Sequence, residues 1–169
     1  PSIKNLLNQN TVIESSANEM YIEPRINESI LKVTENQFTN KLDPVYKLIN
    51  ISSRDNLLQE KDLFGFVGAP WTILVYMINQ VSPKKELKKN FFDDQTLIEK
   101  LFTVIIKFLK IHIKNQVESG ATIIQIFDSW AGLLEQKSYE DYIYNPTIEL
   151  VNYTKKLGVP VICFPRNIK

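Results

Sequence analysis

The chain has 169 residues, of which 44% are hydrophobic and 11% aromatic, so it has enough apolar material for the core of one ordinary domain. Charged residues make up 23%, and the 20 basic side chains nearly balance the 19 acidic ones. This balance argues against intrinsic disorder. It also argues against nucleic-acid binding, which usually goes with a clear basic excess.

Cysteine usage and the missing targeting signals predict a cytoplasmic protein. Cys163 is the only cysteine, so the chain cannot form an internal disulfide, as is usual in a reducing compartment. One cysteine and one histidine, His112, cannot supply the spaced ligands of a zinc site. No apolar run reaches the roughly 18 residues of a membrane span. The start of the chain lacks both an initiator Met and an apolar signal region.

The first part of the chain differs in composition from the rest. Residues 1–40 are polar and rich in Asn, which predicts a connecting segment with a short helix near residues 28–39. The folded domain is expected to cover residues 41–169. Asp43 as an N-cap and Pro44 at the first helical position predict that its first helix begins there.

From residue 62 onward, apolar runs alternate with helical patterns. Short continuous apolar runs predict buried strands, and amphipathic spacing predicts outer helices. Continuous apolar strands are typical of a parallel sheet that is buried on both faces, with right-handed crossovers placing the helices outside. The expected strands cover residues 62–67, 121–127 and 159–164. The first two expected helices cover residues 71–80 and 95–119. A further helix or helix pair ends at residue 158 and is interrupted near residue 145.

Three unusual clusters follow directly after the predicted strands: residues 68–72 (GAPWT), residues 128–132 (DSWAG) and residues 165–166 (PR). Ligand sites of parallel α/β folds form at the carboxyl ends of the strands. The clusters therefore mark a candidate polar site at that edge. The alternative is structural, because short turns between strands and helices need Gly and Pro in any case.

Other chemically distinctive residues favour structural interpretations. His112 lies among apolar positions of a helix and is expected to be packed or hydrogen-bonded rather than catalytic. Cys163 lies within a strand and is expected to be a small core residue. The lysine-rich stretch 84–89 predicts a solvated face, and Phe91 and Phe92 are expected in the core or at an interface.

Two of the clusters carry a resemblance to the uroporphyrinogen decarboxylase family. Residues 65–77, GFVGAPWTILVYM, are similar to that family's G-F-x-G-[AS]-P-W-T segment and the Tyr-Met that follows it. Residues 120–132, GATIIQIFDSWAG, are similar to its G-A-x-x-x-x-[IL]-F-[DE]-[ST]-x-[AG]-G segment. The resemblance covers about residues 41–166, in the same order and with the same separation.

The resemblance implies a fold, a reaction and a set of site residues. The family fold is a (β/α)8 barrel, and a complete one needs more than about 200 residues, so this chain would be part of a barrel with about three parallel strands and outer helices. The reaction removes the carboxyl groups of four acetate side chains of uroporphyrinogen III to give coproporphyrinogen III in haem biosynthesis. The enzyme would be a homodimer without metal or organic cofactor. Tyr76 and Ser129 match substrate-binding positions, while Asp128 and Arg166 would have supporting or rim positions.

The sequence also departs from the family pattern. An N-terminal pair of arginines in an R-Q-A-G-R segment, an Asp after the next strand and a C-terminal His in an N-L-G-H-G stretch are all absent. The chain therefore resembles a central fragment, and we expect the isolated chain to be inactive. Two alternatives remain open: a related cobalamin-dependent barrel methyltransferase, and a non-catalytic remnant.

Overall fold

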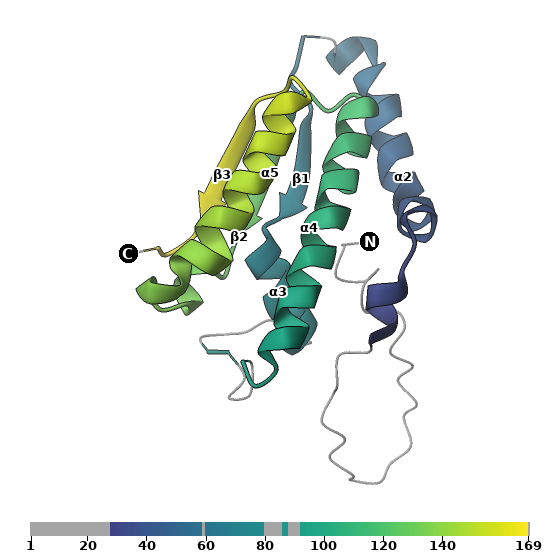
Figure 1. The fold of residues 1–169 in the computed structure, drawn as a ribbon. Coiled ribbons are helices and arrows are strands. Elements are labelled where there is room, and N and C mark those ends of the chain that lie inside the picture. Colours follow the sequence, from purple (N-terminus) through teal and green to yellow (C-terminus); the bar gives the residue numbers. More distant parts are fainter. Residues whose placement is uncertain (1–27, 59, 80–85, 88–91, 169) are drawn as a thin grey trace, which may run out of the picture.

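The computed structural model describes residues 28–58, 60–79, 86–87 and 92–168, and a three-stranded parallel sheet lies at its centre (Figure 1). The strands lie in the order β1 (Phe64–Gly68), β2 (Ile123–Asp128) and β3 (Val161–Pro165). Helices α4 (Gln95–Glu118) and α5 (Asn145–Lys156) lie in front of this sheet in Figure 1. Three parallel strands joined through outer helices form part of a (β/α)8 barrel, which confirms the predicted fold class.

Two further helices and several short turns complete the described chain. The predicted interruption near residue 145 is a change of helix type, because a π-helical turn runs directly into α5 with Pro146 in its first turn. Proline is tolerated there because the first N–H groups of a helix have no intrahelical acceptor. The remaining elements are α2 (Glu35–Ser53), α3 (Pro70–Asn79), the π-helical turn η5 (Glu140–Tyr144), and the 3-10 turns η1 (Glu28–Lys32), η2 (Asn56–Leu58), η3 (Ala131–Leu133) and η4 (Gln136–Ser138).

The sheet is covered on one face only, so the expectation of burial on both faces is wrong for the described residues. Side chains alternate across a strand, and in β1 Val67 is buried against the helices while Phe64 and Phe66 are exposed on the other face. Strand β3 pairs only with β2 and is one of the two edge strands of the described sheet, the other being β1. Cys163 in β3 is consequently exposed, and its predicted place in the core is also wrong.

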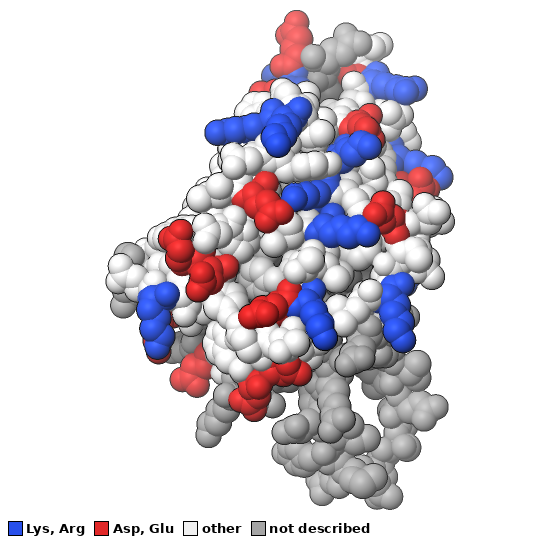
Figure 2. Space-filling view, in the orientation of Figure 1, with Lys and Arg blue, Asp and Glu red and all other residues white. Residues whose placement is uncertain are grey.

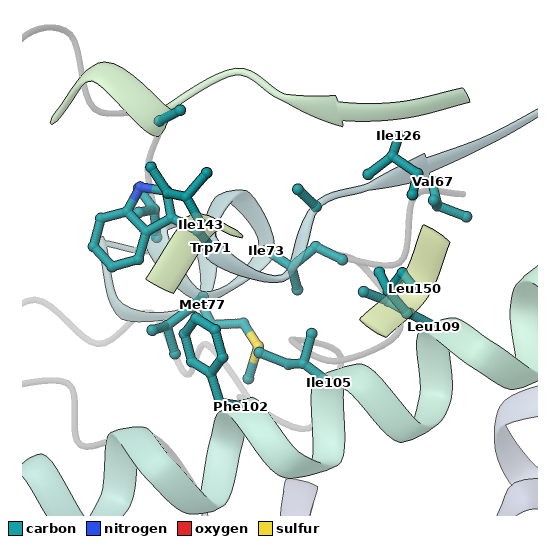
Figure 3. Close-up of a cluster of buried hydrophobic side chains, with 14 of the residues drawn as sticks. Val67, Trp71, Ile73, Met77, Phe102, Ile105, Leu109, Ile126, Ile143 and Leu150 are labelled. Carbon is teal, nitrogen blue, oxygen red and sulfur yellow. The ribbon is translucent and has the colours of Figure 1, made fainter. Parts of the chain in front are cut away.

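The main core lies between the covered face of the sheet and helices α3 and α4 (Figure 3). Trp71 and Met77 of α3 belong to one buried cluster with Phe102 and Ile105 of α4 and with Ile126 of β2. Each such side chain contributes about 1.5–3 kcal/mol when it is fully removed from water. The core therefore fixes α3 beside the strand ends, where the candidate site lies.

Helix α2 begins nine residues before the predicted start, because its N-cap is Thr34 rather than Asp43 and its first residue is Glu35 rather than Pro44. Thr34 and Gln37 form a capping box: the backbone N–H of Gln37 donates to Thr34 Oγ1 at 3.3 Å, and that of Thr34 donates to Gln37 Oε1 at 2.9 Å. Pro44 consequently lies inside the helix. The buried stripe of α2 begins at Phe38, upstream of the residues that suggested the later start.

Helix α4 is amphipathic as predicted, and it packs between α2 and α5. The Asp94 side chain caps its first turn by accepting from the backbone N–H of Leu97 at 2.8 Å. Gly120 follows the C-cap with φ 115°, a conformation that glycine adopts without strain. A Cβ at this position would lie 2.4 Å from the Ser53 side chain of α2, so Gly120 also allows the two helices to approach closely.

The outer helical surface carries basic and acidic side chains side by side (Figure 2). Lys107 of α4 lies 2.9 Å from Glu35 of α2, and Lys110 of α4 pairs with Glu149 of α5. Such exposed ion pairs contribute little to stability. No helix among the described residues is both long and apolar enough to cross a membrane. The lysine-rich stretch 84–89 falls mostly outside the described residues, as does Phe91.

Candidate functional site

The carboxyl ends of the three strands bring the predicted clusters together. Parallel pairing places Gly68 of β1 opposite Phe127 of β2, and Asp128 opposite Pro165 of β3. The backbone N–H of Ala69 donates to the Phe127 carbonyl at 2.8 Å, so the pairing extends beyond β1 into the first turn of the GAPWT segment. The clusters that are far apart in sequence therefore form one edge.

A cavity of about 850 Å³ runs along β1 from this edge toward helices α2 and α4. Tyr76 of α3 and Ser129, directly after β2, both line it, so the structure brings together the two residues predicted to bind substrate. The other lining residues are mainly apolar, and none of the described ones is Lys or Arg. They are Leu42, Val45, Leu48, Ile49, Ser52, Leu63, Phe64, Phe66, Val67, Gly68, Thr72, Ile73, His112, Gln116 and Phe127.

Phe66 and Phe127 give this cavity an aromatic wall that the sequence analysis missed. The two rings are nearly parallel, with centroids 5.8 Å apart, and Phe66 continues the stack toward Phe64 at 6.3 Å. Phe66 is 53% exposed on the uncovered face of the sheet. A strand in which every residue is apolar does not reveal which face each side chain occupies. The signal that could have identified the pair is the alternation itself, counted from the strand register.

Asp128 is buried behind the cavity and does not line it. Its Oδ1 accepts a hydrogen bond from the Thr72 hydroxyl at 2.7 Å. Burial raises the pKa of the Asp128 carboxyl to about 6, although hydrogen bonds from Thr72 and from the backbone of Trp130 oppose the rise. The Thr72 oxygen in turn accepts from the backbone N–H of Trp130 at 3.2 Å.

Two buried polar atoms without a hydrogen-bond partner lie on either side of Ser129. They are Asp128 Oδ2 and Trp130 Nε1, and they are the only such side-chain atoms among the described residues. An unsatisfied buried donor or acceptor costs about 1–3 kcal/mol. Such atoms call for a specific explanation, and both belong to residues adjacent to Ser129.

Arg166 lies in the turn after β3, and only its main chain is tied to the site edge. Its backbone N–H donates to the Asp128 carbonyl at 3.0 Å, and its carbonyl accepts from the N–H of Gly132 at 3.1 Å. The Arg166 side chain is exposed and does not line the cavity. The structure therefore does not bring it together with Tyr76 and Ser129.

The far end of the cavity is closed by side chains of α4. Gln116 donates from its amide to the carbonyl of Phe66 at 3.2 Å and accepts from the Phe66 N–H at 3.0 Å, which satisfies the free edge of β1. His112 Nδ1 lies 3.0 Å from the Tyr46 hydroxyl of α2. Burial lowers the pKa of His112 to about 4 and raises that of Tyr46. The packed, hydrogen-bonded role predicted for His112 is confirmed.

No group of three or more His, Cys, Asp or Glu side chains within the described ranges could hold a metal ion. The donors available at the cavity are instead hydroxyl groups beside aromatic rings. Such an arrangement can hold an apolar ring system and donate hydrogen bonds to anionic groups at its periphery.

Comparison with known proteins identifies one family. The family model described as uroporphyrinogen decarboxylase matches residues 13–168. The chain is 35% identical over 145 residues to a uroporphyrinogen decarboxylase of Campylobacter jejuni, an alignment that covers 83% of this chain and 42% of the relative. It is 34% identical over 154 residues to that of Campylobacter hominis (88% and 45%), and 35% identical over 133 residues to that of Aliarcobacter butzleri (76% and 38%). The chain thus spans less than half the length of these relatives.

Proposed function

This chain belongs to the uroporphyrinogen decarboxylase family, and from that premise we propose that it supplies one wall of a tetrapyrrole site. The reaction at the complete site would convert uroporphyrinogen III to coproporphyrinogen III. The observation that carries the proposal is the single cavity that combines Tyr76 and Ser129 with the aromatic wall. Its volume of about 850 Å³ lies within the range of roughly 300–1,000 Å³ that is usual for small-molecule sites.

Each lining group has a distinct role in this proposal. The exposed ring of Phe66 and the half-buried ring of Phe127 pack against the macrocycle, which is apolar apart from its pyrrole N–H groups. The hydroxyls of Tyr76 and Ser129 donate hydrogen bonds to carboxylates of the substrate side chains. Asp128 stays behind the wall, where its charge does not face a substrate that carries eight carboxylates.

The chemistry places the electron sink in the substrate. Protonation of a pyrrole ring carbon creates a cationic ring, which accepts the electron pair of the breaking carbon–carboxylate bond as carbon dioxide leaves. The exocyclic carbon then takes up a proton to become a methyl group, and the ring carbon returns its own proton. Because the protonated pyrrole itself accepts the electron pair, we infer that the reaction needs no cofactor. Protein groups then bind the carboxylates and deliver protons.

The isolated chain should bind a tetrapyrrole without decarboxylating it. The described lining contains no Lys or Arg to hold several carboxylates, and the sequence lacks the family's N-terminal arginine and aspartate motifs. Anaerobic incubation with uroporphyrinogen III, followed by chromatography of the oxidised porphyrins, should show no coproporphyrin. Formation of coproporphyrin would overturn this part of the proposal.

Binding can be measured with uroporphyrin, the oxidised and unreactive form of the substrate, by quenching of intrinsic fluorescence. Tyr76→Phe and Ser129→Ala should each weaken binding by about tenfold, the loss of one hydrogen bond to a charged group. Tyr144→Phe and Ser138→Ala are matched controls, because neither residue lines the cavity. Equal dissociation constants for the site variants and their controls would show that the cavity is not the binding site. Homodimerisation stays a prediction.

A further inference from the structure

The peptide of Trp130 is held at both of its polar atoms by two consecutive side chains of α3. Trp71 Nε1 donates to the Trp130 carbonyl at 2.9 Å. The backbone N–H of Trp130 donates to Thr72 Oγ1 at 3.2 Å. The first turn of α3 therefore clamps the backbone that follows β2, and we call Trp71 and Thr72 the peptide clamp.

Both members of the peptide clamp are themselves fixed. Thr72 is buried, and its hydroxyl uses its donor on Asp128 Oδ1 at 2.7 Å while it accepts from Trp130, so its rotation is determined. Trp71 is fully buried, with its ring nearly parallel to Phe92 at a centroid distance of 6.3 Å and tilted against Tyr142 at 5.6 Å. Neither side chain can reorient without breaking buried contacts.

The peptide clamp acts on the two residues that line the cavity. Ser129 stands between Asp128 and Trp130, so the clamp restrains the chain on both sides of it. Tyr76 lies one helical turn after Thr72 on α3, and its ring contacts the Trp130 ring edge-on at 6.0 Å. One rigid helix thus carries Tyr76 and, through the clamp, holds the backbone of Ser129.

We propose that Trp71 and Thr72 are positioning residues that set the Ser129 hydroxyl against that of Tyr76, so that both reach carboxylates of one tetrapyrrole. This inference rests on the proposed function for its ligand, but the geometry of the clamp can be tested separately. Trp71 does not line the cavity, and Thr72, which borders it, has its hydroxyl already engaged by Asp128 and by the Trp130 N–H. Their effect passes through the Trp130 peptide.

The first experiment tests the clamp without a ligand. Trp71 and Trp130 are the only two tryptophans, so Trp71→Phe leaves Trp130 as the single indole. In that background Thr72→Val removes the hydroxyl at nearly constant volume, whereas Thr72→Ser keeps it. We expect Thr72→Val to raise acrylamide quenching of Trp130 at least twofold and Thr72→Ser to leave it within experimental error. Equal quenching in the two variants would overturn the role of Thr72 in holding the Trp130 peptide.

The second experiment asks whether Thr72 acts through Ser129. Uroporphyrin binding is measured for Thr72→Val, Thr72→Ser, Ser129→Ala and the Thr72→Val/Ser129→Ala double variant. We expect Thr72→Val to weaken uroporphyrin binding about tenfold and Thr72→Ser to weaken it by less than twofold. In the Ser129→Ala background, Thr72→Val should weaken binding by less than a further twofold. An equal loss in both backgrounds would mean a general structural effect and would overturn the proposal.

The two experiments separate failure of the clamp from failure of the proposed function. If the wild-type chain does not bind uroporphyrin, the assignment of the tetrapyrrole cavity fails, and the proposal that the clamp serves such a ligand fails with it. The quenching comparison then still decides whether Thr72 holds the Trp130 peptide. Urea unfolding of every variant checks that a weakened affinity is measured on folded protein.

Discussion

Two buried titratable groups should make opposite contributions to the pH dependence of stability. His112 and Asp128 are 4% and 3% exposed, so neither is screened by much water. Burial lowers the pKa of His112 from 6.5 to about 4 and raises that of Asp128 from 3.8 to about 6. One pH unit of difference between folded and unfolded pKa values corresponds to about 1.4 kcal/mol, so each group contributes roughly 3 kcal/mol.

The signs follow from which state holds the proton. Between about pH 4 and pH 6.5, the unfolded chain is protonated at His112 and the folded chain is not, so this group lowers stability as the pH falls through that window. Between pH 3.8 and about 6, the folded chain is protonated at Asp128 and the unfolded chain is not, so this group lowers stability as the pH rises. Over the shared window the two contributions nearly cancel.

Single substitutions should therefore expose slopes of opposite sign. Asp128→Asn leaves His112 uncompensated, and its unfolding free energy, relative to wild type, should rise by about 2–3 kcal/mol from pH 4 to pH 6. His112→Asn keeps a polar atom near the Tyr46 hydroxyl, and its relative unfolding free energy should fall by a similar amount. Differences from wild type remove the contribution of all other carboxylates.

Urea unfolding followed by circular dichroism across this pH range measures both slopes. The two variants together provide the control, because a general loss of stability would shift each curve without tilting it. If both variants follow the wild-type pH dependence in parallel, the reasoning from burial is refuted for these groups. If only one variant changes the slope of the pH dependence, the titratable group that is replaced in the other variant reaches water in the folded state.

Three further outcomes can be checked by unfolding and sedimentation. Gln116→Leu removes both hydrogen bonds to the free edge of β1 and should lower the unfolding free energy by about 1–3 kcal/mol; no loss would mean that water replaces the amide. Gly120→Ala should lower the unfolding free energy by about 1–3 kcal/mol, and by more than Gly158→Ala does. Both glycines have positive φ, but only a Cβ at Gly120 would meet a side chain, at 2.4 Å. Equal losses of stability in the two variants would refute the close approach of Gly120 to α2. The uncovered apolar face of the sheet should make the isolated chain self-associate. Phe164→Ser on that face should reduce this self-association more than Ile148→Ser on the outer helix α5, although the two side chains are 55% and 53% exposed. Equal effects would refute a role for that face.

The order and direction of the strands could be predicted because they depend on local signals. Each strand is a short apolar run that a Gly- or Pro-containing turn bounds; α3 is a mostly apolar helix, and α4 has clear amphipathic spacing. The start of α2 could not be predicted from Asp43 and Pro44, because two capping signals compete within ten residues. The capping box at Thr34 wins, since it satisfies two backbone N–H groups and adds Phe38 to the buried stripe.

The location of the site could be predicted from the sequence, because the carboxyl ends of parallel strands meet at one edge of the sheet. Tyr76 and Ser129 line the same cavity. Asp128, which directly precedes Ser129, and Arg166, which follows β3, do not line it. Sequence order gives neighbours along the chain, whereas strand alternation turns adjacent side chains to opposite faces. Phe66 was missed for the same reason, because an apolar residue in a strand fits the core as well as an open face.

The two family segments supply hydroxyls to the cavity and also bind each other. Tyr76 and Ser129 line the cavity. Trp71 of the first segment binds the backbone of the second, and Thr72, which also borders the cavity, binds that backbone and Asp128. A ligand that needs two hydroxyls at a fixed separation requires both kinds of residue, because a hydroxyl on a free turn would lose much of its binding energy to ordering. The two segments bind each other, so a resemblance that covers both of them describes a single site. It also implies that Thr72→Val, which removes the hydroxyl, should weaken affinity about as much as Ser129→Ala, although Thr72 donates its hydrogen bond to Asp128.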